Sequence, residues 1–353
     1  MGKKDLGADR VKTLKIHGST GDSNILIGES FQNLQKYIAS EQVVIITDSN
    51  VRRLYGKDFP PYEIIEIGMG EKIKTLDTVK TIYGKLVALE ADRSSLIVGI
   101  GGGIVCDIAG FIASTYLRGV RVGFVASTLL SQVDASVGGK NGVNFEGYKN
   151  MVGVFNQPEF VVCDMDLLKT LPEKEVLCGL AEVVKHAAIG DADLFSYLEK
   201  HYKRVLQLDA EVIEKVVYDS VLIKSSIVNK DEKEEGERRK LNFGHTLGHA
   251  LEKTTGAPHG EAVSAGMVVA SALSEKRGYL STEEKERIEA LLKKFQLPTS
   301  RVQLDGKRVL DAVRKDKKRE GEEINFVLLQ GIGKAVVEKI SMKELETAIG
   351  EMI

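Results

Sequence analysis

The chain has 353 residues, which corresponds to about two domains of ordinary size. Hydrophobic residues make up 43% and charged residues 28%, which is globular usage and excludes a disordered chain or a disulfide scaffold. A net charge of -2 argues against nucleic acid or an anionic membrane surface as a partner. The three cysteines show no CxxC spacing, which is typical of a reducing compartment and argues against a thiolate metal site.

The amino-terminal residues lack the apolar segment of a signal peptide. No stretch approaches the ~18 apolar residues of a membrane span. We therefore expect a cytoplasmic protein.

The first half of the chain alternates short β-branched runs with helix-like segments, the pattern of parallel strands joined by crossover helices. Strands are expected at residues 43–50, 94–101, 120–128 and at the start of 160–172. Residues 173–295 are instead rich in Leu, Ala, Glu and Lys at helical spacing. We predict an α/β domain with a parallel sheet over residues 1–171 and a mainly α-helical domain over residues 172–353.

A glycine-rich turn, with Gly101, Gly102 and Gly103, lies between an apolar strand and a helix expected to open near Val105. Backbone N–H groups and the helix dipole at such a turn can hold a phosphate, which indicates a nucleotide site. The spacing differs from the GxGxxG of a standard Rossmann turn, so a purely structural turn is the alternative.

Four charged residues near this turn are candidates for the nucleotide. Asp107 follows in the same helix, where it could bind a ribose or a nicotinamide-side group or simply satisfy the helix dipole. Asp48 ends the strand at residues 43–50, where a doubly wound sheet presents an acid to an adenosine ribose. Glu71 and Lys74 stand three apart at an expected helix start, and both could equally be surface residues.

Three of the six histidines gather within residues 242–267, which points to a metal. His245 and His249 are four residues apart and share one helical face, so spacing nominates them as a ligand pair, with capped-helix surface histidines as the alternative. His259 follows a Gly-Ala-Pro turn that could return it to the same place. Glu182 lies in an apolar helical segment and needs a partner. Two histidines and one carboxylate leave a position open, as in a catalytic site.

Residues 127–158 are glycine-rich with weak helix and strand signals, and we expect a functional loop there. With further lysines and arginines, this segment could bind a small substrate that bears carboxylate and phosphate groups. A single such cation is more often a solvated side chain. The charged runs at residues 230–240 and 314–323 are interpreted as solvated loops.

In order along the chain, "GGGIVCDIAGFIASTYLRG", "DASVGGKNGVN", "GYKNMVGVFNQP", "LAEVVKHAAI", "RRKLNFGHTLGHALE" and "HGEAVSAGM" together resemble the 3-dehydroquinate synthase family. The match runs from about Asp48 to Lys318. The resemblance implies a dinucleotide-binding domain joined to a helical metal-binding domain, with the active site in the cleft between them. It also implies bound NAD, a catalytic zinc or cobalt ion, a homodimer, and a phosphorylated sugar acid as substrate.

The resemblance assigns site residues by motif position. Metal ligands would be Glu182, His245 and His259, which replaces His249 of the spacing argument; His249 would take part in proton transfer, with Glu234 as another proton acceptor. NAD contacts would be Asp48, Asn50, Glu71, Lys74, Gly102, Gly103, Asp107, Ser127, Thr128, Lys149 and Thr170. Substrate contacts would be Arg118, Asp134, Lys140, Asn150, Lys185, Lys224, Arg238, Asn242 and Lys317, with Lys318 as the alternative to Lys317.

The implied reaction converts 3-deoxy-D-arabino-heptulosonate 7-phosphate to 3-dehydroquinate and phosphate in the shikimate pathway of aromatic amino acid biosynthesis. NAD would act catalytically, because the hydride that it removes is returned before the ring closes. Three alternatives are another sugar-phosphate cyclase, a metal-dependent polyol dehydrogenase and an inactive NAD-binding module. Ser127, where a threonine is more usual, and the opening segment at residues 17–28 depart from the family pattern.

Overall fold

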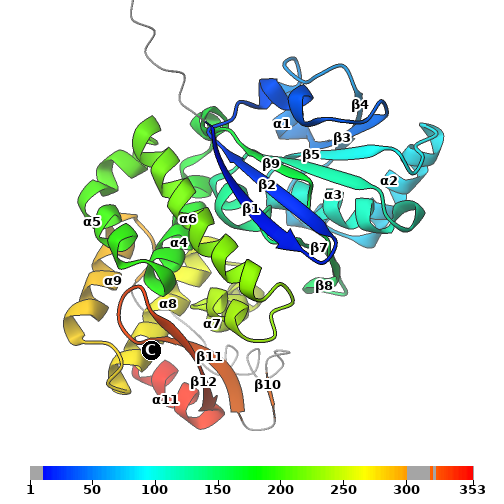
Figure 1. Ribbon diagram of the computed structural model, residues 1–353. Helices are drawn as coiled ribbons and strands as arrows, with labels where there is room; N and C mark the ends of the chain where they lie inside the picture. Colours follow the sequence, from blue (N-terminus) through cyan, green and yellow to red (C-terminus); the bar gives the residue numbers. More distant parts are fainter. Residues whose placement is uncertain (1–10, 300–318, 321–322, 353) are drawn as a thin grey trace, which may run out of the picture. The chain divides into compact units, whose positions relative to one another are not determined.

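The computed structural model describes residues 11–299, 319–320 and 323–352 of the chain (Figure 1). Its contacts divide the chain into two compact units, Met1–Leu171 and Pro172–Ile353. An α/β unit with a parallel sheet and a mainly helical unit confirm the predicted fold class.

A seven-stranded sheet organises the first unit. Its strand order is β1 (Lys12–Gly18), β2 (Gly21–Ile27), β9 (Phe160–Cys163), β6 (Arg121–Ala126), β5 (Leu96–Gly101), β3 (Val43–Asp48) and β4 (Glu63–Ile67). Only the β1–β2 pair is antiparallel; the other neighbours are parallel. The apolar runs at the predicted strands are buried here, as expected of a parallel sheet whose faces are both covered.

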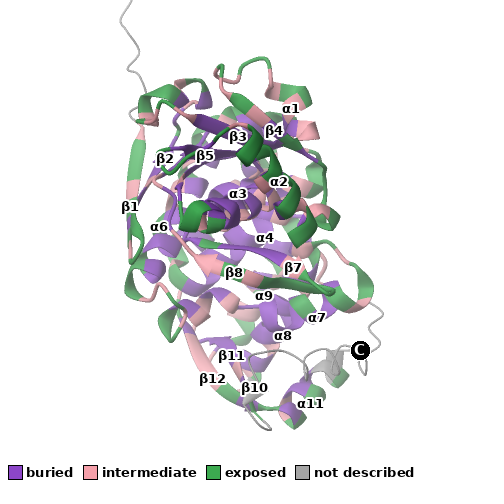
Figure 2. Ribbon diagram, turned by 90° about the vertical axis from the view of Figure 1, so that its right-hand side faces the viewer, coloured by how far each residue is buried: buried purple, intermediate pink, exposed green. Residues whose placement is uncertain are grey.

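Three α-helices follow strands of this sheet: α1 (Ser49–Tyr55), α2 (Leu76–Ala88) and α3 (Gly103–Thr115). Figure 2 shows α3 almost wholly buried, whereas α2 exposes one face. The turn before α3 requires glycine because a Cβ on Gly101 would lie 2.5 Å from the Val105 side chain. The glycine run is therefore needed for close strand–helix packing as well as for any ligand.

The segment at residues 127–158 is not the irregular loop that we expected. It forms a π-helical turn (Ser131–Ala135) and a β-hairpin of β7 (Lys140–Phe145) and β8 (Tyr148–Phe155). Gly142 and Gly153 face each other across the hairpin, where a Cβ on either would lie 2.6–2.7 Å from backbone of the other strand. Glycines that indicated a loop thus allow two strands to approach closely.

The second unit is built mainly from helices. These are α4 (Glu173–Gly190), α5 (Ala192–Leu206), α6 (Ala210–Lys230), α7 (His245–Thr255), α8 (His259–Lys276), α9 (Thr282–Lys294) and α11 (Met342–Met352). A small antiparallel sheet of β10 (Arg319–Glu320), β11 (Glu323–Leu329) and β12 (Ala335–Ser341) joins them, which composition did not predict.

Helices α7 and α8 pack closely because glycines line their contact. A Cβ on Gly266 would lie 1.9 Å from the Gly244 carbonyl oxygen, and one on Gly248 would lie 3.2 Å from the Val263 backbone. This close packing holds the first turns of both helices near α4. Among the described helices, none is long and apolar enough to cross a membrane.

Candidate functional site

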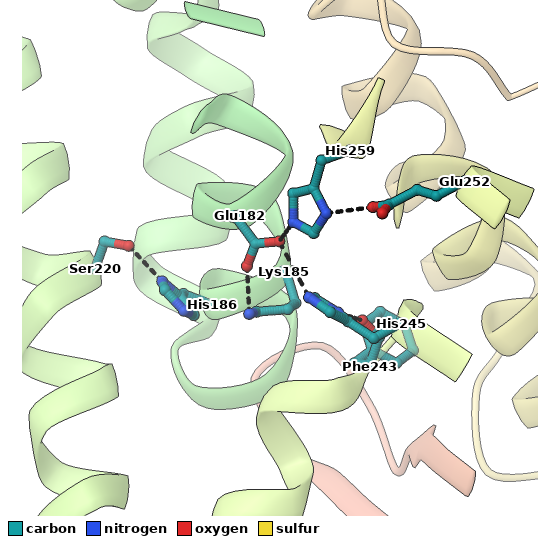
Figure 3. Close-up of polar contacts among 8 residues, drawn as sticks. All are labelled: Glu182, Lys185, His186, Ser220, Phe243, His245, Glu252 and His259. Atoms are coloured by element: carbon teal, nitrogen blue, oxygen red, sulfur yellow. Dashed lines mark hydrogen bonds and ion pairs between the residues drawn. The ribbon is translucent and has the colours of Figure 1, made fainter. Parts of the chain in front are cut away.

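A buried carboxylate on α4 forms the centre of the candidate metal site in the second unit (Figure 3). Glu182 is fully buried and its Oε2 is paired with the ammonium of Lys185, one helical turn later on the same face. Burying a carboxylate requires compensating positive charge and hydrogen bonds. The other oxygen, Oε1, faces two histidines from α7 and α8.

Each histidine presents its Nε2 atom to this oxygen. His245 Nε2 lies 3.4 Å from Glu182 Oε1, and its Nδ1 lies 3.1 Å from the Phe243 carbonyl oxygen. His259 Nε2 lies 3.1 Å from the same Oε1, and its Nδ1 contacts the Glu252 carboxylate. Because both Nδ1 partners can only accept, each Nδ1 carries a hydrogen and donates it. The two Nε2 atoms are therefore fixed in direction toward one point.

This donor set fits a divalent cation. Ligand atoms of Glu182, His245 and His259 all lie within 4.8 Å of one another, and two nitrogens with one carboxylate are the set of an open catalytic site. Burial alone would lower the pKa of His259, but hydrogen bonds to Glu182 and Glu252 outweigh it and raise that pKa to about 10. The surroundings therefore favour positive charge at this point.

The two histidines differ in their electrostatics. Burial holds the pKa of His245 well below its usual range, and the opposing attraction of Glu182 does not outweigh it. Its imidazole is therefore neutral at physiological pH, which is the form that binds a metal.

The geometry favours a different group from the pair nominated by helical spacing. His249 lies on α7 with its ring edge-on to that of His245, at 5.4 Å between centroids, and it is outside the group above among the described residues. The group that the structure brings together is the one implied by the family resemblance. Its role in metal binding stays a prediction.

Sequence reasoning missed Glu252, which holds His259. This carboxylate is 7% exposed and lies seven residues after His245, on the same face of α7. The available signal was a glutamate seven residues after His245 in the same expected helix. The Phe243 carbonyl, which holds His245, has no side-chain signature.

The remaining histidines have structural surroundings. His186 is fully buried, and its Nδ1 lies 2.6 Å from the Ser220 hydroxyl (Figure 3). His17 lies at the surface beside Asp22, and His201 packs against Tyr197.

The candidate dinucleotide residues gather at one edge of the parallel sheet in the first unit. Asp48 ends β3, Gly102 and Gly103 follow β5, and Ser127 and Thr128 follow β6. Because these strands are parallel neighbours, their carboxyl ends meet at the same edge, where dinucleotides bind in open α/β sheets. Part of this edge also serves the fold: Asp48 Oδ1 accepts from the Asn50 and Val51 N–H groups and caps α1.

An ammonium group links the helix α3 to the hairpin at this edge. Lys74 is 4% exposed, and its Nζ donates to Asp107 Oδ2 and to Asn150 Oδ1. Burial raises the pKa of Asp107, and the Lys74 charge opposes this rise. Asn150 has a left-handed backbone with φ of 50°. Glu71 lies in the same turn as Lys74, whereas Lys149 is exposed on β8 and Thr170 contacts the Tyr55 hydroxyl at 2.6 Å.

The other candidate substrate residues of the first unit lie on separate segments. Arg118 ends the short turn after α3, with φ of 71°, and is exposed. Asp134 lies in the π-helical turn, and Lys140 begins β7.

In the second unit, three cations of the candidate substrate set are buried: Lys185 on α4, Lys224 on α6 and Arg238, which are 1%, 6% and 2% exposed. Glu234 has φ of 64°, and its Oε1 accepts from the Asn242 amide. Lys317 and Lys318 lie outside the described residues.

The segment at residues 230–240 is more than the solvated loop that we expected. The Asp231 carboxylate accepts from the backbone N–H groups of Glu235, Gly236 and Arg238 at 2.7–2.9 Å. The Arg238 guanidinium also donates to the Glu232 carbonyl. The charge pattern predicted a solvated loop and did not reveal that Asp231 accepts three backbone N–H groups beside the buried Arg238.

The chain is similar in structure to known sugar-phosphate cyclases. The chain matches the structure of 2-deoxy-scyllo-inosose synthase complexed with carbaglucose-6-phosphate, NAD+ and Co2+, with a TM-score of 0.86 and 26% identity over 97% of this chain and all of that one. It matches 2-epi-5-epi-valiolone synthase from Streptomyces hygroscopicus, with NAD+ and Zn2+ bound, at a TM-score of 0.86 and 27% identity over 97% and 99%. These neighbours and the site geometry define a sugar-phosphate cyclase fold. A probable glycerol dehydrogenase from Sinorhizobium meliloti shares the fold alone, at a TM-score of 0.66 and 15% identity over 91% and 93%.

The family follows from the sequence relatives. The models for the 3-dehydroquinate synthase N-terminal and C-terminal domains match residues 64–178 and 179–319. A 3-dehydroquinate synthase from Dehalococcoides mccartyi is 40% identical over 97% of this chain and its own full length. One from Acidithiobacillus ferrooxidans is 44% identical over 84% of each chain. The chain belongs to the 3-dehydroquinate synthase family and is an enzyme.

Proposed function

We propose that the protein converts 3-deoxy-D-arabino-heptulosonate 7-phosphate to 3-dehydroquinate and phosphate. The observation that carries the proposal is the presence, in one unit, of a histidine–carboxylate group and three buried cations, Lys185, Lys224 and Arg238. Ammonium and guanidinium groups pair with carboxylate and phosphate oxygens; a phosphorylated sugar acid carries both of these anionic groups, whereas a polyol carries neither. The family relatives bear the name of this activity.

Two groups would supply the chemistry that side chains lack: NAD would provide reversible hydride transfer, and a divalent metal would provide a Lewis acid. Glu182, His245 and His259 would hold the metal. NAD would contact Asp48, Asn50, Glu71, Lys74, Gly102, Gly103, Asp107, Ser127, Thr128, Lys149 and Thr170. The zinc and cobalt bound by the structural neighbours support either metal here.

The cationic and amide side chains would bind and orient the substrate. Guanidinium and ammonium groups pair with carboxylate and phosphate oxygens, and buried ones do so more strongly than solvated ones. A substrate that is fixed at both anionic ends keeps its reacting carbons in one orientation. The residues assigned to this role are Arg118, Asp134, Lys140, Asn150, Lys185, Lys224, Arg238, Asn242 and Lys317.

Two residues would move protons. His249 lies beside His245 without belonging to the ligand group, so its imidazole is suited to exchange a proton with a substrate hydroxyl. Glu234, whose Oε1 accepts from Asn242, would be a second acceptor. Elimination of phosphate needs proton removal from the adjacent carbon, for which the departing phosphate is itself a candidate base.

The main alternative is a different cyclic product on the same scaffold. The structural neighbours that make such products are 26–27% identical, whereas the dehydroquinate synthase relatives are 40–44% identical. The higher identity over most of the chain favours dehydroquinate. A net dehydrogenase is the second alternative.

The test is phosphate release from the heptulosonate phosphate by purified protein with NAD and Zn²⁺, while NADH absorbance is followed. We expect phosphate and dehydroquinate in equal amounts and no accumulating NADH, because the hydride returns within each turnover. Accumulation of NADH with a polyol would indicate a dehydrogenase. Turnover only with a different sugar phosphate would indicate another cyclase.

We further propose a cytoplasmic homodimer. The family resemblance supports the dimer, and the free cysteines Cys106, Cys163 and Cys178 are consistent with a reducing compartment. Sedimentation of the purified protein measures directly whether it is a dimer.

A further inference from the structure

Asn144 on β7 joins two segments that are distant in the sequence. Its backbone N–H donates to the Lys74 carbonyl at 2.8 Å, and an isolated parallel bridge pairs it with Thr75. Its side-chain Nδ2 donates to Glu71 Oε1 at 2.7 Å. Its Oδ1 accepts from the Asn150 backbone N–H at 2.9 Å. One residue therefore ties the turn before α2 to the second strand of the hairpin.

These contacts demand an amide at this position. The carboxylate of Glu71 can only accept, and the backbone N–H of Asn150 can only donate, so the side chain between them must do both. An aspartate would set a second carboxylate against Glu71, and an apolar residue would satisfy neither group. The partners also fix which side-chain atom is nitrogen and which is oxygen.

The residues held by Asn144 surround one ammonium group. Lys74 is buried, and its Nζ donates to Asp107 on one side and to the Asn150 side chain on the other. Asn150 adopts a left-handed backbone, which costs free energy unless its surroundings hold it. The bond from its N–H to Asn144 is a contact that does so.

We propose that Asn144 is a positioning residue for the nicotinamide dinucleotide. It holds Glu71 and Asn150 so that Lys74 and Asp107 keep the arrangement that the cofactor meets. The inference rests on the proposed function only in taking Glu71, Lys74 and Asp107 as cofactor contacts. Asn144 itself stands outside the residues that the family resemblance assigns.

The first experiment is a double-mutant cycle on NAD affinity, measured by titration calorimetry with the full chain. Asn144→Asp should weaken NAD binding about tenfold, because it replaces a hydrogen bond with like charges. In the double variant Glu71→Gln, Asn144→Asp, the new amide can donate to the new carboxylate. The loss caused by Asn144→Asp should therefore be several-fold smaller in the Glu71→Gln background.

Asn33→Asp is the matched control. Asn33 lies in the same unit, and its Nδ2 also donates to a glutamate, Glu29 Oε1, at 2.8 Å. The control introduces the same pair of carboxylates away from the cluster, so its NAD affinity should equal that of the wild type. Equal loss of affinity in both variants would assign the effect to general destabilisation and overturn the proposal.

Amide exchange of the free protein provides a readout without NAD or turnover. Peptides that cover residues 148–152 should exchange faster in Asn144→Leu than in the wild type or Asn33→Asp, because leucine offers the Asn150 N–H no side-chain acceptor. If the Asn144 variants show wild-type exchange in these peptides and wild-type NAD affinity, the inference is wrong. If the wild type binds NAD but forms no dehydroquinate, the proposed function fails while this comparison still decides the role of Asn144.

Discussion

In the candidate metal site, the hydrogen bond made by Nδ1 determines where the imidazoles of His245 and His259 point. The Phe243 carbonyl orients His245 and the Glu252 carboxylate orients His259, so both Nε2 atoms face Glu182. His249 shares a helical face with His245, but helical spacing fixes only the Cβ positions. The direction of the ring depends on partners that lie elsewhere in the sequence.

Separate substitutions of the histidines distinguish these roles. His245→Ala and His259→Ala should each lose the metal during dialysis, because a ligand is removed. His249→Ala should retain about one equivalent per chain while turnover falls about 10²-fold or more, the usual loss for a proton-transfer group. Metal content by mass spectrometry and steady-state kinetics measure both. Equal metal loss from His245→Ala and His249→Ala would restore the pair suggested by spacing.

Glu252→Gln should weaken metal binding without removing a ligand. The carboxamide can still accept from His259 Nδ1, but it no longer makes the imidazole more basic, and such outer contacts are worth about 10–100-fold in affinity. Competition with a chelator measures the change. Glu261→Gln, an exposed site in the first turn of α8, is the control and should bind metal as the wild type does.

At the scale of elements, the loop after α6 depends on one carboxylate. Burial would raise the pKa of Asp231, but backbone N–H donors from Arg238, Glu235 and Gly236 outweigh burial and lower it. A folded-state pKa below the unfolded value means that the ionised group stabilises the fold above the unfolded pKa. That contribution is lost as the pH falls through the lower, folded-state pKa.

Asp231→Asn should therefore destabilise the protein in a pH-dependent way. Near neutral pH we expect the free energy of unfolding to fall by about 1–3 kcal/mol, since an amide nitrogen would replace one of the two oxygens that accept from backbone N–H groups. The difference in free energy of unfolding between variant and wild type should narrow below pH ~3.9, the usual pKa of aspartate in an unfolded chain. Thermal unfolding from pH 3 to 7 measures it. Glu237→Gln is the control, because the exposed Glu237 carboxylate pairs with Lys240 at the surface. Its free energy of unfolding should stay within about 0.5 kcal/mol of the wild-type value at every pH.

Elements were predictable where one local signal dominated. The buried β-branched runs of β3, β5, β6 and β9 were predicted because a parallel strand is apolar on both faces. The hairpin of β7 and β8 was not predicted. Gly142 and Gly153 allow its two strands to approach closely, but in the sequence alone glycines indicate a break in a strand. The sheet of β10 to β12 was missed for another reason: although β11 and β12 have seven residues each, they follow a long helical region, and the helical prediction was extended to the end of the chain.

At the scale of the whole chain, the candidate cofactor residues and the candidate metal ligands lie in different units. The sheet edge with Asp48 and Gly102 belongs to Met1–Leu171, and the group with Glu182 and His245 belongs to Pro172–Ile353. Sequence motifs nominated both sets of candidate residues, because each set depends on residue types with few structural substitutes. Positioning residues such as Asn144 and Glu252 were missed because their partners are set by tertiary contacts.

This division predicts separate protection by the two cofactors. A metal at about 1,000 times its dissociation constant stabilises the state that binds it by about 4 kcal/mol. Zinc alone should therefore slow amide exchange most in α4, α7 and α8, whereas NAD alone should slow it most in residues 71–74, 101–107 and 144–150. In His245→Ala the zinc effect should vanish and the NAD effect should remain. Equal protection of residues 101–107 and α7 by zinc would contradict the assignment of the metal to the helical unit.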